Sequence, residues 1–135
     1  MGELNKLSAF DAVNGIRTKR FTSQQLMADC ISRIEKCEPS VRAWAHFDPE
    51  HAMAEAKKAD QKQDHGERLG PLHGIPVGIK DVIDAKGMPG ENGSPIFANR
   101  VPEEDSRAVT QLKNAGAIIM GKTVTTEMAN LTPSK

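Results

Sequence analysis

Residues 70–81, GPLHGIPVGIKD, join a turn to a short apolar segment that ends in two charged residues. The glycines and prolines of residues 70–76 predict a tight loop, and residues 77–80 predict a buried strand. Lys80 stands at the end of that strand. Desolvation lowers the pKa of a buried lysine, so such an amine can act as a general base near neutral pH. The alternative, which spacing alone favours, is a structural lysine that reaches water or pairs with Asp81 or Asp84.

Helical patterns come before this stretch. Ser8 predicts the cap of a short helix, and a capping box at Thr22 predicts the start of an amphipathic helix that ends before Pro39. Residues 41–47 have the composition of a short strand. A cap at residue 48 and a proline after it then predict a further helix to about residue 62. The first half of the chain is therefore expected to be mainly helical.

The pattern after residue 81 differs, because residues 86–105 contain several glycines and prolines and no periodicity. A stretch of this length is more typical of a binding loop than of a simple connection. Asp105 predicts the cap of a helix that ends at Gly116, and residues 117–120 predict a buried strand. Strands at 77–80 and 117–120, joined through a helix, indicate an α/β fold.

Residues 116–123, GAIIMGKT, match the spacing of a phosphate-binding loop. In such a loop a strand comes before the first glycine, backbone N–H groups hold phosphate, and a helix begins at the lysine. Here a helix is expected before Gly116 and a strand after it, which is the reverse order. We therefore do not expect this segment to bind a nucleotide.

Composition narrows the classes of function. The chain has 135 residues, enough for one domain, and its 18 basic and 18 acidic residues cancel, which gives nucleic acid binding and membrane binding no support. No metal-ligand spacing occurs among its histidines and cysteines. Cys30 and Cys37 would lie about 10 Å apart along one helix, too far for a disulfide. With no secretory or membrane-spanning pattern, a reducing, cytoplasmic location is expected.

Four ordered segments resemble the amino-terminal part of the amidase signature family: GPLHGIPVGIKD at 70–81, ENGSPIF at 91–97, DSRAVTQLKNAGAIIMGKT at 105–123, and TEMA at 126–129. Residues 22–62 also look like the leading helices of that family. The resemblance implies an α/β fold with amino-terminal helices and the first strands of a mixed sheet, which is expected to be incomplete. It further implies that residues 1–135 are the amino-terminal portion of one amidase domain, with a helical lead-in at 1–69 and the start of the catalytic α/β core at 70–135.

The resemblance also implies a chemistry. In that family the lysine at the position of Lys80 is the base of a Ser-cisSer-Lys triad that hydrolyses amides through an acyl-enzyme, with no cofactor and no metal. The Gly/Ser-rich segment that carries both serines follows the GKT…E…A stretch in the family, and this sequence does not contain it. Ser94 is expected to be structural. Met88 is a candidate substrate contact, since the corresponding loop borders the substrate channel in the family.

Three interpretations of the chain remain open from the sequence. An amidase part carrying only the lysine base should not hydrolyse simple amides by itself. A truncated, non-catalytic assembly module is the second interpretation, and a glutaminase-type subunit of a tRNA-dependent amidotransferase is the third. The expected partners are a small-molecule amide and either the carboxy-terminal remainder of the domain or a second copy, because missing strands leave sheet edges uncovered.

Overall fold

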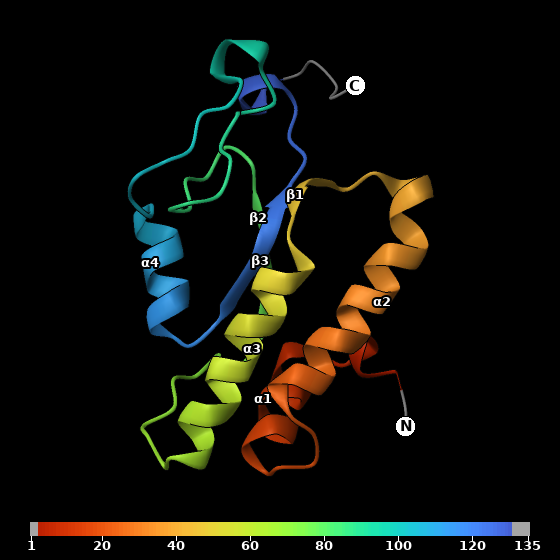
Figure 1. Cartoon of the computed structure of the whole chain (residues 1–135), viewed down its shortest axis with the longest axis vertical. Coiled ribbons are helices and arrows are strands. Elements are labelled where there is room, and N and C mark those ends of the chain that lie inside the picture. The colour runs from red at the N-terminus through yellow and green to blue at the C-terminus, as the bar shows by residue number, and fades with distance from the viewer. Residues whose placement is uncertain (1–2, 131–135) are drawn as a thin grey trace.

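The computed structural model describes residues 3–130, and within that range the chain forms a small sheet surrounded by helices (Figure 1). The α-helices and strands follow in the order α1 (Ala9–Arg17), α2 (Ser23–Val41), β1 (Trp44–Phe47), α3 (Pro49–Asp64), β2 (Pro76–Lys80), α4 (Arg107–Asn114) and β3 (Ile118–Thr123). Single turns of 3-10 helix lie at Leu4–Lys6, Pro95–Phe97 and Glu127–Ala129.

The strands form a mixed sheet in the order β1-β3-β2. Strand β3 is central, pairing antiparallel with β1 and parallel with β2. Because β2 and β3 are parallel, Lys80 and Thr123 are paired at the same end of the sheet. This end carries the loop that continues from β2, so the fold brings together segments far apart in the sequence.

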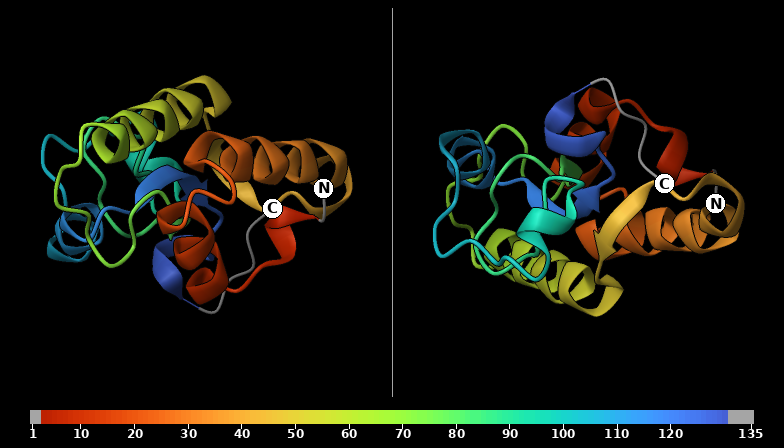
Figure 2. Two further views of the ribbon diagram at one scale, coloured as in Figure 1. Left: turned by 90° about the horizontal axis from the view of Figure 1, so that it is seen from below. Right: turned by 90° about the horizontal axis from the view of Figure 1, so that it is seen from above.

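Helices cover both faces of the central strand. On one face Met27 of α2 and Ala52 and Ala56 of α3 pack with Ile118 and Met120. On the other face Val109 of α4 packs with Ile119. Figure 2 shows this arrangement along the long axis of the molecule, with α3 and α4 apart and the strands between the helices.

The predicted starts of the first three α-helices are confirmed. The Ser8 hydroxyl accepts from the Asp11 amide, the Asp48 carboxylate caps α3 in the same way, and Thr22 forms the complete capping box with Gln25. These side chains satisfy amides that have no partner within the helix. Local sequence therefore determines where α1, α2 and α3 begin.

The predicted end of α2 is wrong, because the helix continues through Pro39 to Val41. The Glu38 carboxylate accepts from the Ala43 and Trp44 amides at 3.1 and 2.9 Å, which closes the helix end. The same contacts engage residues that were expected in the strand. Strand β1 consequently begins only at Trp44.

The cap of α4 is Ser106 instead of the expected Asp105: the Ser106 hydroxyl accepts from the Val109 amide. The Asp105 carboxylate accepts from the Lys86 amide at 2.7 Å and also pairs with Lys113. The predicted helix, glycine and strand otherwise occur in order, with Gly116 at a φ of +91° between α4 and β3. This order confirms that residues 116–123 do not form a phosphate-binding loop.

A bulge in β3 determines which way its last residues face. Val77 pairs with Ile119, whereas Gly78 pairs with Gly121, so Met120 is an extra residue in β3. In a strand, an extra residue reverses the alternation of side chains beyond it. Lys122 is therefore paired with Ile79 and shares its face, although by simple alternation it would share the face of Ile118 and Met120.

Candidate active site at the ends of β2 and β3

Lys80 is the last residue of β2, and its side chain is exposed. Its partner in the register is Thr123, which places it on the face of the sheet opposite Lys122. The expectation that Lys80 is a buried amine is not met within the described residues, because β2 is an edge strand whose burial is confined to Ile79. The structure places Lys80 at an open position of the sheet.

The expected alternative, an ion pair of Lys80 with Asp81 or Asp84, is also not found within residues 3–130. Asp81 pairs with Lys122 and Asp84 pairs with Arg100. Both carboxylates are thus engaged by other cations, and the Lys80 amine has no ion pair with any residue that the structure describes. Lys80 is available for contacts with groups outside this part of the chain.

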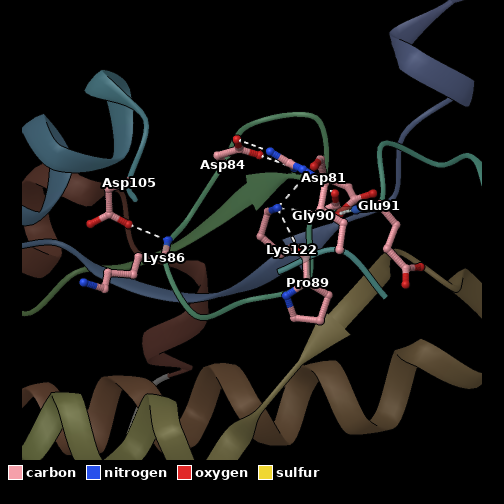
Figure 3. Close-up of polar contacts among 9 residues, drawn as sticks. Asp81, Asp84, Lys86, Pro89, Gly90, Glu91, Asp105 and Lys122 are labelled. Atoms are coloured by element: carbon pink, nitrogen blue, oxygen red, sulfur yellow. Dashed lines mark hydrogen bonds and ion pairs between the residues drawn. The ribbon is translucent and has the colours of Figure 1, made fainter. Parts of the chain in front are cut away.

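Lys122 is the buried lysine of this site, with a side chain that is 0% exposed. Its Nζ donates to the carbonyl oxygens of Asp81 and Pro89 at 3.2 and 3.1 Å, and lies 3.6 Å from Asp81 Oδ1 (Figure 3). Burial lowers the pKa of Lys122, and the nearby Asp81 carboxylate opposes that shift. Two backbone carbonyls and one carboxylate therefore surround a single ammonium group.

The Asp81 carboxylate connects the end of β2 to the following loop. It accepts from the Gly93 and Glu91 amides at 3.0 and 3.3 Å, and the Asp81 amide donates to the Thr123 carbonyl at 2.9 Å. Asp81 is itself buried. One residue next to Lys80 thus contacts β3 through its backbone and the 91–93 turn through its side chain.

Arg100 also holds the loop that follows β2. Its guanidinium donates to both carboxylate oxygens of Asp84 at 2.7 and 2.6 Å and to the Gly90 carbonyl at 3.0 Å. The hydrogen bonds from Arg100 lower the pKa of Asp84. Because Arg100 bridges two points of the loop, residues 84–100 are closed into a compact structure beside Lys122.

Ser94 is structural in this chain, as its sequence context indicates. Its buried hydroxyl donates to Glu127 Oε1 at 2.7 Å and accepts from the Ile96 amide, while the Met128 amide donates to the Asn92 carbonyl. These contacts join the 91–97 segment to the 126–129 segment. All four segments of the family resemblance therefore meet at this end of the sheet.

Met88 is buried in the core, where it packs with Ile79, Val109 and Ile119. It also lines a cleft of about 540 Å³ between α3, α4 and the start of β3, and the Lys80 side chain does not line that cleft. The structure therefore does not bring the two predicted site residues together within residues 3–130. A role for Met88 in binding substrate stays a prediction.

His73 lies against the same cleft and is buried. Burial lowers its pKa, and its Nε2 has no hydrogen-bond partner within the described part of the chain. A neutral histidine suits this position, since a buried charge without a partner is costly.

Among residues 3–130 there is no group of three or more metal-ligating side chains. No helix in the same range is long and apolar enough to cross a membrane.

No pattern in the sequence singles out Lys122 as a site residue. The sequence places it only in the GAIIMGKT segment, two residues after the apolar run 117–120 of a strand expected to be buried. A lysine this close to a buried strand is a signal for a buried amine. The bulge at Met120, which turns Lys122 toward Asp81 and Pro89, is a pairing irregularity that no local pattern predicted.

Comparison with known proteins identifies the family. The family model for Amidase matches residues 25–134. The chain belongs to the amidase family. A glutamyl-tRNA(Gln) amidotransferase subunit of Chloroflexus aggregans is 38% identical over 122 residues, covering 90% of this chain and 25% of that relative. A putative amidase, AmiD, of Mycobacterium bovis is 36% identical over 128 residues, covering 95% of this chain and 27% of that protein.

Solved structures agree with this assignment. The peptide amidase of Stenotrophomonas maltophilia superposes with a TM-score of 0.85 at 32% identity, covering 93% of this chain and 26% of that one. The predicted fold class, helices with strands of the mixed amidase sheet, is confirmed. The chain spans about a quarter of the length of the relatives that it matches.

Proposed function

We propose that this chain supplies the lysine base of a Ser-cisSer-Lys amide hydrolase, with Lys80 as the base. The single observation that carries the proposal is the family match across residues 25–134, which includes the GIPVGIKD segment that ends in Lys80 and Asp81. The position of Lys80 supports it further, because the amine is exposed at the end of β2 and no described carboxylate pairs with it.

The proposed chemistry needs groups beyond these 135 residues. A neutral Lys80 amine would accept a proton from the nucleophilic serine through the bridging serine, and the serine oxygen would attack the amide carbonyl to give an acyl-enzyme. Water would then hydrolyse the ester. We place both serines in a Gly/Ser-rich segment outside the chain, so we expect no hydrolysis of simple amides by the chain itself.

A second candidate function uses the same lysine. The relative from Chloroflexus aggregans is named as part of a glutamyl-tRNA(Gln) amidotransferase, and it is 38% identical to this chain. In that case the amide would be glutamine, and the released ammonia would pass to a partner protein. Glutaminase activity that rises when partner proteins and a charged tRNA are added would favour this candidate over a stand-alone amidase.

The proposal includes partners and a location. The remaining part of the domain is the expected partner, since β2 is an edge strand with the exposed Lys80 at its end. A small-molecule amide is the expected substrate. A reducing compartment such as the cytoplasm is proposed because Cys30 and Cys37 are both free thiols.

The test replaces Lys80 in a polypeptide that continues these 135 residues through a Gly/Ser-rich segment. Lys80→Met and Lys80→Arg should each lower kcat for an aryl amide by roughly 10²–10⁴-fold, since a guanidinium stays protonated and cannot accept a proton. Lys86→Arg is the matched control, because Lys86 is also exposed and follows the same strand. Retention of most activity by Lys80→Arg would reject Lys80 as the base.

A further inference from the structure

We propose that Lys122 is a positioning residue for Lys80: its buried ammonium fixes the backbone just after Lys80 and thereby the direction of the Lys80 side chain. This inference rests on the proposed function of Lys80. It assigns a role to a buried cation that the proposed proton transfer does not use. The two lysines lie on opposite faces of the sheet, so the effect passes through the backbone and not through contact of the amines.

The geometry of the Lys122 ammonium favours a backbone clamp. Its two contacts within hydrogen-bonding distance are the carbonyls of Asp81 and Pro89, at 3.2 and 3.1 Å. The carboxylate of Asp81 is farther away, at 3.6 Å. The carbonyl of Asp81 is one residue beyond Lys80, so this contact holds the strand end from the face opposite the Lys80 side chain.

Asp81 is also held by contacts with β3 and with the 91–93 turn. From one side, the Asp81 amide donates to the Thr123 carbonyl and continues the β2·β3 ladder past Lys80. From the other, the Asp81 carboxylate accepts from the Gly93 and Glu91 amides and holds the 91–93 turn. Lys122 connects both sets of contacts, because it bonds the Asp81 carbonyl and the Pro89 carbonyl at once.

The bulge at Met120 is what allows this arrangement. If β3 paired regularly through Met120, Lys122 would lie on the face of Ile118 and Met120, where Ala52 and Ala56 of α3 pack. With the bulge, the side chain reaches the loop that follows β2. A pairing irregularity that directs one buried lysine toward the strand end beside Lys80 is typical of bulges that redirect a side chain near an active site.

Lys122 could act only by balancing the charge of Asp81, and this role predicts different results from positioning. Two variants separate the two roles. Lys122→Met removes the ammonium and leaves the Asp81 carboxylate buried without its cation. The double variant Lys122→Met, Asp81→Asn removes both charges but does not restore a donor to the Asp81 and Pro89 carbonyls. If Lys122 only balances charge, the double variant should recover stability and activity together. If it positions Lys80, stability should recover while activity does not.

The experiment uses the longer polypeptide of the Lys80 test, which continues these 135 residues through a Gly/Ser-rich segment. The substrate is an aryl amide. Lys122→Met should lower kcat by about 10–100-fold with little change in KM, because a misplaced base slows the chemical step while binding is kept. The double variant should regain most of the melting temperature lost in Lys122→Met and keep the low kcat. Lys113→Met is the control, since it removes a lysine whose ion pair with Asp105 is partly exposed.

Four outcomes would count against the account. Parallel recovery of kcat and melting temperature in the double variant would overturn positioning, as would normal kcat in Lys122→Met while Lys80→Met is inactive. If Lys122→Met does not fold, Lys122→Gln replaces it, because its amide can donate to one carbonyl; its kcat should then be intermediate, and wild-type kcat would overturn the inference. Activity retained by Lys80→Met would instead reject the proposed function. That result differs from the ones that overturn the positioning role, so the two failures can be told apart.

Discussion

Lys80 and Lys122 lie at the same end of two neighbouring parallel strands, yet one is exposed and the other is buried. Lys80 is exposed on the face of Thr123, with no ion pair among the residues that the structure describes. Lys122 is fully buried on the face of Ile79, with two carbonyls and a carboxylate around its ammonium. The difference of face follows from the one-residue bulge at Met120.

This contrast separates two criteria that are easily merged when only the sequence is known. A desolvated amine is the physical property wanted in a lysine base, and within residues 3–130 Lys122 has it. Position in a family pattern is the other criterion, and it selects Lys80. Lys122 is buried by residues of this chain, whereas Lys80 is exposed among the residues that the structure describes. A buried lysine can therefore support a site without being its base.

The largest stability effect is expected at Lys122. Lys122→Met should lower the free energy of unfolding by about 3–5 kcal/mol, because it leaves the buried Asp81 carboxylate without its cation. Lys80→Met should change it by less than about 0.5 kcal/mol, since that side chain is exposed. Urea unfolding of the two variants measures the contrast. Equal effects at the two positions would remove the distinction between them.

A smaller loss of stability is expected on the face of the sheet opposite Lys122, where Gly78 and Gly121 lie against the Trp44 ring. At Gly121 a Cβ would meet the His46 backbone carbonyl, so Gly121→Ala should cost about 1–3 kcal/mol through overpacking. At Gly78 it would lie 2.9 Å from the Trp44 side chain, which can shift, so Gly78→Ala should cost less. Thermal melts rank the two. A larger cost at Gly78 would contradict the described approach of β1 to β3.

The hydrogen bond from Ser94 to Glu127 should contribute less to stability than the close packing at Gly121. Ser94→Ala removes the 2.7 Å hydrogen bond to Glu127 and should lower the free energy of unfolding by about 1–2 kcal/mol. Ser40→Ala is the control, because the Ser40 hydroxyl is exposed and bonds only a local carbonyl. A neutral result for Ser94→Ala in urea unfolding would show that the 91–97 and 126–129 segments are held together without this contact.

The smallest effect is a pH dependence at His73. Burial lowers its pKa in the folded chain from the ordinary 6.5, so below that pH the unfolded chain binds more protons. Its contribution to stability should be complete above about pH 6.5 and be lost as pH falls toward the folded pKa, with a slope of at most about 1.4 kcal/mol per pH unit. His73→Gln should flatten that slope, whereas His51→Gln, at an exposed position, should not.

The elements that depend on local side chains were predictable, and those that depend on pairing were not. Thr22 and Asp48 mark helix starts because their side chains satisfy amides a few residues away. The continuation of α2 through Pro39 was missed because the Glu38 carboxylate, which closes that end, gives no separate pattern. The role of Lys80 as base stays a prediction, although its place at the end of a strand was predictable. The Lys122 clamp was not, since it requires the bulge and a loop folded back from residue 89.

The most direct test of Lys80 as base measures the rate of labelling by a fluorophosphonate, in the longer polypeptide that continues through a Gly/Ser-rich segment. The nucleophilic serine oxygen attacks phosphorus, fluoride leaves, and the base accepts the serine proton. Lys80→Met and Lys80→Arg should label far more slowly than the wild type, because neither side chain can accept that proton. Lys122→Met should label at an intermediate rate, because its base is present but misplaced. Labelling of Lys80→Arg at the wild-type rate would contradict the assignment.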